Sequence, residues 1–141
     1  MTGVRTSVTF ELQGVPLSPN RSRWAREDPV FIAWRDKAAF ECRGARAKAG
    51  WRTDEEPAPR WVRIVQYRHR PIDVDHKVTS CTPLLNGMAL GNGLIYDDTD
   101  ASVGGLCHLL PVDQVRIPTT ERERTVITVW LVQPEEVPHA G

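Results

Sequence analysis

The residues best suited to chemistry are aspartates in two groups between positions 70 and 100. Asp73 and Asp75 lie in Arg-Pro-Ile-Asp-Val-Asp-His-Lys, and Asp97, Asp98 and Asp100 lie in Leu-Ile-Tyr-Asp-Asp-Thr-Asp. If the first segment is extended, Asp73 and Asp75 point to the same side, because a strand has a period of two. A dense group of carboxylates repels itself unless it binds a hard cation, takes up protons or faces basic groups.

A divalent metal site is the chemistry that these acids suggest. Mg²⁺ is usually held by one or two carboxylates together with water and substrate phosphate. Such a site activates a water and stabilises the charge of phosphoryl transfer. Asp73, Asp75 and Asp98 are the candidate ligands, and Lys77 is a candidate for stabilising charge or positioning the water. An Asp-rich surface turn and a structural Ca²⁺ loop are the alternatives that the same residues leave open.

The charges are divided unequally along the chain, although their sum is zero. Residues 1–72 hold 14 Lys and Arg against 8 Asp and Glu, whereas residues 73–141 hold 4 against 10. This division fits a protein that grips phosphate with its basic half and metal with its acidic half. The alternative is that the two halves mix in space and neutralise each other.

The cysteines favour a reduced, cytoplasmic setting. The chain has an odd number of them, Cys42, Cys81 and Cys107, with no paired spacing. Cys81 and Cys107-His108 with His69 or His76 form only a weak zinc candidate, because no two lie at the spacing of structural sites. The sequence contains no apolar run of membrane-spanning length and no secretory signal at its start, so we expect no membrane partner.

The length predicts one domain with an α+β fold, over residues 1–132, followed by a flexible tail over 133–141. Strands are expected at 6–12 and 61–68, with a Pro-containing loop after the first. A helix over 30–48 begins at Asp28-Pro29 and ends near Gly50. Its apolar stripe includes Phe31, Trp34 and Phe40. Trp51, Trp61 and Trp130 are expected in the core rather than as platforms for bases.

The acids are expected beside short elements in the second half of the chain. Pro83 favours a helix at about 82–90 rather than one that starts at His76, because Pro inside a helix costs roughly 3 kcal/mol. An irregular or kinked lead-in precedes that helix. Residues 94–96 are expected to form a short strand or an extended run. Residues 102–110, 112–117 and 123–132 are expected to be strands, with the last one buried. The result is a mixed sheet with two main helices and a β-rich C-terminal part.

An ordered set of motifs resembles the RusA family of Holliday junction resolvases over most of the chain. After a first strand comes a Pro-containing loop that ends in Asn20-Arg21, and later a helix with Trp34-Arg35. A second strand leads into Arg70-Pro-Ile-Asp-Val-Asp-His. A helix with Leu84-Leu-Asn-Gly and the run Leu94-Ile-Tyr-Asp-Asp complete the set.

The resemblance implies a Mg²⁺-dependent endodeoxyribonuclease, with Mn²⁺ as a possible substitute, that cuts four-way or branched DNA as a homodimer. Such proteins are common in phages and prophages and act in DNA recombination and repair. A two-fold dimer supplies two sites for two symmetric nicks. The implied essential carboxylates are Asp73, Asp75 and Asp98. Together with the loop chemistry, we expect phosphate contacts from five residues: Asn20, Arg21, Arg23, Arg68 and Arg70.

Two positions depart from the family pattern. His76 stands where the family has Asn, and its imidazole can still donate a hydrogen bond. The family lysine lies about a helical turn further on, where this chain has Thr79 and Ser80, so Lys77 is nearer to the acids. These departures motivate a second hypothesis, in which the protein binds junctions or DNA on the same scaffold with weakened catalysis.

Overall fold

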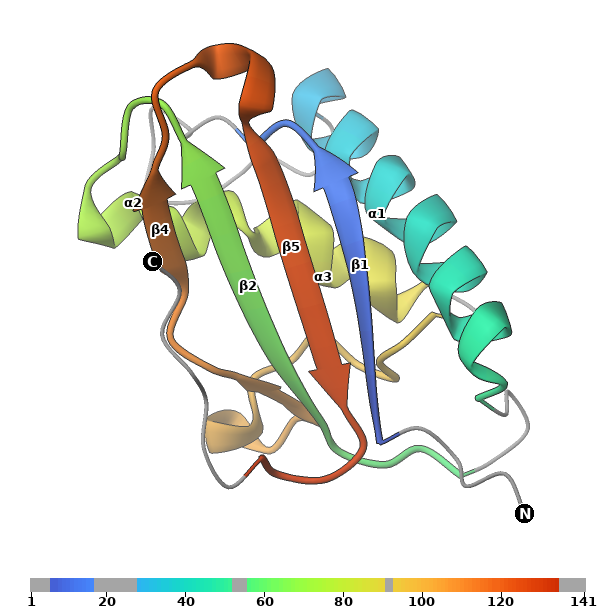
Figure 1. Cartoon of the computed structure of the whole chain (residues 1–141). Helices are drawn as coiled ribbons and strands as arrows, with labels where there is room; N and C mark the ends of the chain where they lie inside the picture. The colour runs from blue at the N-terminus through green and yellow to red at the C-terminus, as the bar shows by residue number, and fades with distance from the viewer. Residues whose placement is uncertain (1–5, 17–27, 52–55, 91–92, 135–141) are drawn as a thin grey trace.

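The structure, a computed structural model, describes residues 6–16, 28–51, 56–90 and 93–134. They form a five-stranded mixed sheet with helices packed against it, which confirms the predicted α+β fold (Figure 1). The strands are β1 (Ser7–Gln13), β2 (Arg60–Arg68), β3 (Cys107–Leu109), β4 (Asp113–Arg116) and β5 (Arg124–Trp130). The order is β1-β5-β2-β3, and β4 also pairs with β2.

Strand β2 lies at the centre of the sheet. It pairs antiparallel with β5 and parallel with the two short strands, β3 against its first residues and β4 against its last. Strand β5 in turn pairs antiparallel with β1 along the whole of that strand. Val62 and Ile64 on one face of β2 are buried, whereas Trp61 and Tyr67 on its other face are half-buried.

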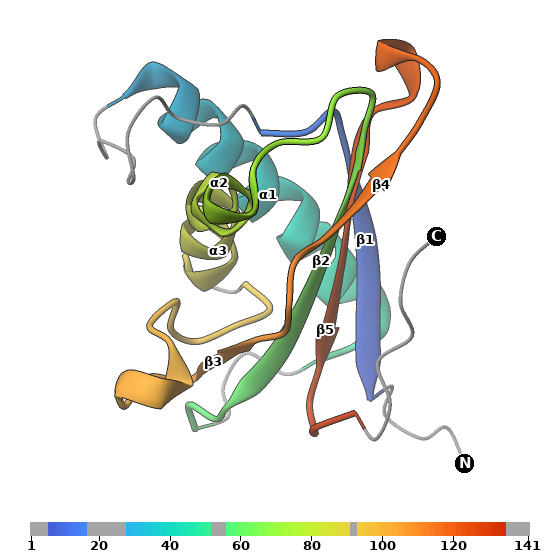
Figure 2. The same ribbon diagram turned by 90° about the vertical axis from the view of Figure 1, so that its left-hand side faces the viewer.

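The three α-helices lie on one face of the sheet (Figure 2). None of the described helices lies against the other face, which is called the uncovered face below. Helix α1 (Pro29–Ala49) starts as predicted: the Asp28 carboxylate accepts a hydrogen bond from the N–H of Val30, at 2.8 Å. It ends at Gly50, whose φ of 72° places it in the left-handed region that favours glycine. Helix α3 (Thr82–Ala89) crosses behind the sheet beside α1. A side chain at Gly87 would collide with the backbone of Arg35, so glycine permits this close approach.

The hydrophobic core fills the space between the covered face and the helices. Alternate residues of β1, β2 and β5 point into it, among them Leu12, Ile64 and Ile127, and α3 adds Leu84 and Met88. Removing this apolar surface from water supplies the main driving force for folding. The expected burial of Trp51 is confirmed, since it is 6 % exposed.

The lead-in to α3 is a helix of its own, which corrects the expectation of an irregular or kinked segment. Helix α2 spans Val74–Ser80, and the chain turns at Cys81 before α3 begins. Pro83 lies in the first turn of α3, where its missing N–H is not needed. The turn at Cys81 therefore places Pro83 at the start of a helix, so that neither helix has proline in its interior. It also means that Asp75 belongs to a helix and not to an extended segment.

Residues 102–110 were wrongly expected to form one strand. A 3₁₀ turn occupies Ala101–Val103, and only Cys107–Leu109 pairs with β2. Gly105 approaches Thr99 so closely that a side chain there would collide with it, which favours a turn over a strand. Residues 94–96 contain no strand, and the strands expected at 112–117 and 123–132 are β4 and β5.

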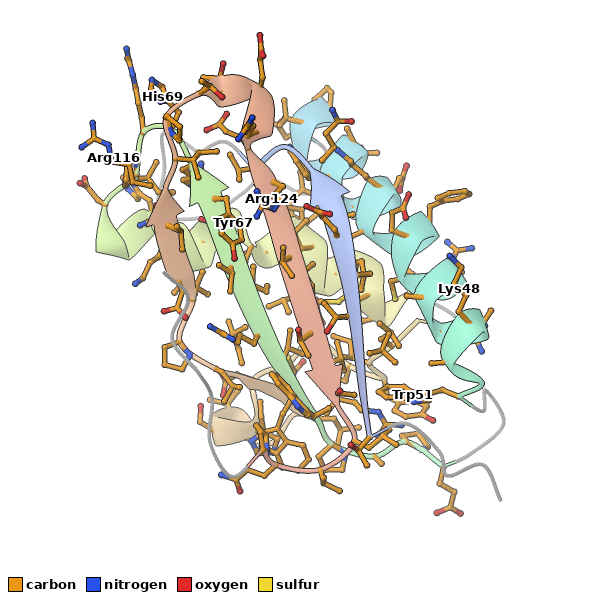
Figure 3. The ribbon with its side chains drawn as sticks, viewed as in Figure 1. Lys48, Trp51, Tyr67, His69, Arg116 and Arg124 are labelled. Carbon is orange, nitrogen blue, oxygen red and sulfur yellow. The ribbon has the colours of Figure 1, made fainter. Side chains whose placement is uncertain are left out.

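Three large aromatic residues do not lie where the sequence pattern placed them. Trp61 and Trp130 are half-buried on the uncovered face, where Trp61 stacks on His108 with ring centres 4.5 Å apart. On the same face the Arg124 guanidinium lies over the Tyr67 ring (Figure 3). Phe40, expected in the stripe of α1 that faces the core, is 74 % exposed.

Candidate functional site

Asp73 lies where the polypeptide leaves β2 and enters α2. It is the residue before the first turn of α2, and its carbonyl oxygen accepts from the N–H groups of His76 and Lys77. Asp73 is exposed, and its side chain makes no capping hydrogen bond with α2. Asp75 follows within α2, and its side chain lies outside the described part of the structure. Because residues four apart share a helix face, Lys77 lies one turn after Asp73.

A buried polar network fixes α2 to the end of β2. The Gln66 amide donates to the Ser80 hydroxyl at 2.9 Å and to the Cys81 sulfur at 3.2 Å. The Arg68 guanidinium donates to Gln66 Oε1 at 2.9 Å and to the Pro16 carbonyl at 2.6 Å. The network therefore joins three segments: the end of β2, the end of α2 and the start of the Pro-containing loop.

The loop between β2 and α2 is held by a second amide. The Gln114 side chain on β4 accepts from the Ile72 N–H and donates to the Ile72 carbonyl, both at 2.9 Å. The N–H of His69 donates to the Glu123 carboxylate at 3.0 Å. These bonds set the backbone on both sides of Arg70 and place the residue before Asp73.

Asp97 and Asp100 shape their own loop. The Asp97 carboxylate accepts from the N–H of Thr99 at 3.0 Å, and the Asp100 carboxylate accepts from the N–H of Ser102 at 2.7 Å. These hydrogen bonds favour the charged forms and lower the pKa of both carboxyl groups. Both side chains therefore have a structural explanation in local turns.

Asp98 differs from these neighbours because its carboxylate accepts a hydrogen bond from another element. The Asn86 side-chain amide on α3 donates to Asp98 Oδ2 at 3.3 Å. Asn86 belongs to the Leu84–Gly87 motif. Its hydrogen bond to Asp98, twelve positions later, therefore joins two segments of the motif set. The half-buried carboxylate of Asp98 keeps unused acceptor capacity for a cation.

Negative charge is concentrated around the first residue of β3. Burial is the main cause that raises the pKa of Cys107 to about 12, and the charges of Asp100, Asp98 and Asp97 raise it further. Burial also raises the pKa of Cys42 to about 11 and that of Cys81 to about 12. The three cysteines are buried free thiols, which makes them poor nucleophiles at neutral pH.

The predicted phosphate-binding residues divide into three cases. Asn20, Arg21 and Arg23 lie outside the described residues. Arg70 is exposed beside Asp73 and is free to face a ligand. Arg68 is 3 % exposed, and its guanidinium is used by Gln66 and Pro16, so it does not face solvent.

The donor chemistry of the acids fits a hard divalent cation. Asp73 and Asp98 offer carboxylate oxygens that carry few or no protein hydrogen bonds, and oxygen is the ligand type that Mg²⁺ prefers. Within the part of the chain described, no group of three His, Cys, Asp or Glu residues is close enough to hold a metal. The complete set would need Asp75, whose side chain lies outside the described part of the structure.

Sequence reasoning missed the amide residues that position these acids. Asn86, Gln66 and Gln114 each connect a segment that carries an acid or a base to a helix or strand. Gln66 had a detectable signal, since a polar residue between Val65 and Tyr67 in a strand predicted to be buried must be hydrogen-bonded if it is itself buried. Asn86 lies within the Leu84-Leu-Asn-Gly motif, but the sequence analysis assigned it no role. Gln114 had no signal, because its partner Ile72 is 42 positions away.

Comparisons with known proteins add little to this description. No family model matches the chain, and no curated protein matches it. A solved structure of cyanuric acid hydrolase is similar at 12 % identity with a TM-score of 0.40. The similarity covers 88 % of this chain and 37 % of that protein. None of the described helices has the length and apolar character needed to cross a bilayer.

Proposed function

We propose that this protein is a Mg²⁺-dependent, structure-selective DNA endonuclease of the RusA type. It cuts four-way or branched DNA by paired symmetric nicks, as a homodimer in the cytoplasm, which is that of the host cell if the protein is phage-encoded. The observation that carries the proposal is the contact between Asn86 and Asp98, because it joins two segments of the motif set on which the resemblance depends.

The acidic residues hold the metal in this proposal. Asp73, Asp75 and Asp98 would bind Mg²⁺, which supplies an activated water and stabilises the charge of the phosphoryl group. Asn86 orients the Asp98 carboxylate, as outer hydrogen bonds commonly do for metal ligands. Lys77, one turn after Asp73, supplies positive charge near the scissile phosphate.

Basic residues outside the acidic cluster position the DNA. Arg70 precedes Asp73 on a loop that Gln114 fixes, so a phosphate bound there lies next to the carboxylates. Arg21 and Arg23 are further candidates from the Pro-containing loop. Arg68 is excluded from direct contact by its burial and instead fixes the base of that loop through Pro16. Phosphate contacts of this kind recognise the shape of a junction rather than its base sequence.

Cleavage of a synthetic four-way junction tests the proposal. With Mg²⁺ we expect paired nicks near the crossover. Asp98→Asn should reduce the cleavage rate by roughly 100-fold or more, because a metal ligand loses its charge. The matched control is Asp113→Asn, since Asp113 pairs with Arg63 on the uncovered face and belongs to no acidic motif.

The alternative function is junction or DNA binding without turnover, and the position of Lys77 favours it. Folded protein that binds the junction tightly and leaves it uncut, in both Mg²⁺ and Mn²⁺, would support this alternative. Protein that neither binds nor cuts branched DNA would rule out both functions. If the enzyme hypothesis holds, Asp75→Asn should lose cutting and keep binding, because the variant repels phosphate less.

A further inference from the structure

The outer face of α1 carries an exposed aromatic residue that the monomer does not use. Phe40 lies near the middle of the helix, and 74 % of its surface is exposed. Ala33, Gly44 and Ala47 share the same narrow stripe, because the spacings of seven, four and seven from Phe40 return to one side of a helix. A protruding ring is thus flanked by small, exposed residues.

Gly44 has no explanation within the described part of the chain. Glycine inside a helix is unfavourable relative to alanine, because it loses more conformational freedom on folding. A Cβ at Gly44 would meet nothing within 4 Å, so the packing of this chain does not require glycine. At Gly87, by contrast, a neighbouring helix leaves no space for a side chain. Close approach of another helix from outside would explain Gly44 in the same way.

A two-fold axis through Phe40 would align two copies of α1 antiparallel over nearly their full length. Phe40 lies within one residue of the centre of Pro29–Ala49. In this register, residues equally far before and after position 40 face each other. Ala33 then faces Ala47 of the partner subunit, and Gly44 faces Asp36 of the partner subunit. The small size of Ala33, Gly44 and Ala47 lets the helix backbones approach closely.

The charges beside the stripe are complementary in the same register. Asp36 and Arg43 lie on one flank of α1, and the register brings Asp36 next to Arg43 of the partner subunit. Asp36 pairs with Arg35 in the monomer, with 60 % of its side chain exposed, and such exposed pairs are easily exchanged. On the other flank, Lys37 is held by the Gln13 carbonyl and lies over the Trp34 ring, which keeps it out of the helix contact.

We propose that a second copy of this chain docks here, with the two α1 helices antiparallel and Phe40 at the two-fold axis. The interface is isologous: each helix presents the same ring, the same small residues and the same charges. The inference shares only the homodimer with the proposed function, and it does not depend on nuclease activity. Its test is made without DNA, so failure of cleavage and failure of this interface are separate results.

The mass of the protein in solution tests the interface. Sedimentation equilibrium of the full chain should give twice the 15.9 kDa monomer mass. Phe40→Arg should raise the dissociation constant by roughly 30-fold or more, because a central aromatic anchor is replaced by a charge. Val103→Arg is the matched control, since Val103 is also 74 % exposed and lies on another element. Circular dichroism should show both variants folded, because neither side chain is in the core.

Crosslinking tests the direction of the helices. Ala33→Cys protein mixed with Ala47→Cys protein should form a disulfide-linked dimer on oxidation, whereas Ala33→Cys protein alone should not. A linked dimer from Ala33→Cys alone would indicate parallel helices and overturn the register. Asp36→Arg alone and Arg43→Asp alone should each weaken the dimer. The double variant that carries both changes should restore it, because the opposite charges again face each other across the interface. A monomeric wild-type protein, or a dimer that Phe40→Arg leaves unchanged, would overturn the interface itself.

Discussion

Two polar regions flank the α2–α3 unit, and they are built in opposite ways. The first, Gln66, Arg68 and Ser80, is buried, and its members bond to one another and to backbone. The second, Asp97, Asp98 and Asp100, is accessible to solvent, and only Asp98 bonds to a side chain of another element. Basic and acidic residues that the sequence assigned to one site thus take different roles according to their burial.

The contrast separates residues that build the site from residues that are free to act in it. The Arg68 guanidinium is buried and donates to two protein groups. Burial lowers the pKa of Arg68, with smaller opposing effects from Cys81 and Glu123. An exposed carboxylate retains lone pairs for a cation. We therefore assign Arg68 to the scaffold, and we retain Asp98 and Arg70 as candidates for direct contact with ligands.

The largest expected effect on stability comes from breaking the buried region. Arg68→Met should lower the free energy of unfolding by about 3 kcal/mol, because Gln66 Oε1 and the Pro16 carbonyl lose their donor. Urea denaturation measures the change. Arg116→Met is the matched control, since Arg116 pairs with Arg68 in register on β4 but is exposed, and it should change stability by less than about 0.5 kcal/mol. An Arg68→Met protein that keeps its stability and loses DNA affinity would reverse the assignment.

A smaller effect is expected where α3 meets the acidic loop. Asn86→Ala should weaken Mg²⁺ binding by about 10-fold, because Asp98 loses the group that orients it. The free energy of unfolding should fall by only about 1 kcal/mol. Titration calorimetry with Mg²⁺ measures the first quantity, and Thr82→Ala, an exposed position on the same helix, is the control. Equal metal affinity in both variants would show that Asn86 acts only in folding.

The smallest effect is expected from acid. The pKa values of Asp97 and Asp100 are lowered from 3.8 by hydrogen bonds to the charged forms. Their contribution to stability is therefore complete above pH 3.8 and is lost as pH falls through the lower values of the folded state. Thermal melts between pH 5 and pH 2 measure this loss. The slope should be shallower in the Asp97→Asn, Asp100→Asn double variant; an unchanged slope would assign the acid sensitivity to other groups.

Local patterns determined much of the architecture. Alternation over 6–12 identified β1, and the composition of 123–132 identified β5. Asp28-Pro29 and Gly50 bounded α1. These elements follow from rules that act within one turn or one strand. The loss of a strand at 102–105 and the exposure of Phe40 follow from packing between elements, which periodicity does not report.

The sequence by itself determined which residues have the chemistry for a metal site and, through the order of the motifs, the family that they resemble. The tertiary structure decided which polar residues face solvent. It placed Arg68 inside and joined Asn86 to Asp98, and it left Phe40 and Gly44 on an open helix face. The physical reason is that burial and hydrogen bonding depend on partners that chain folding brings from distant positions, whereas residue type and spacing are local properties.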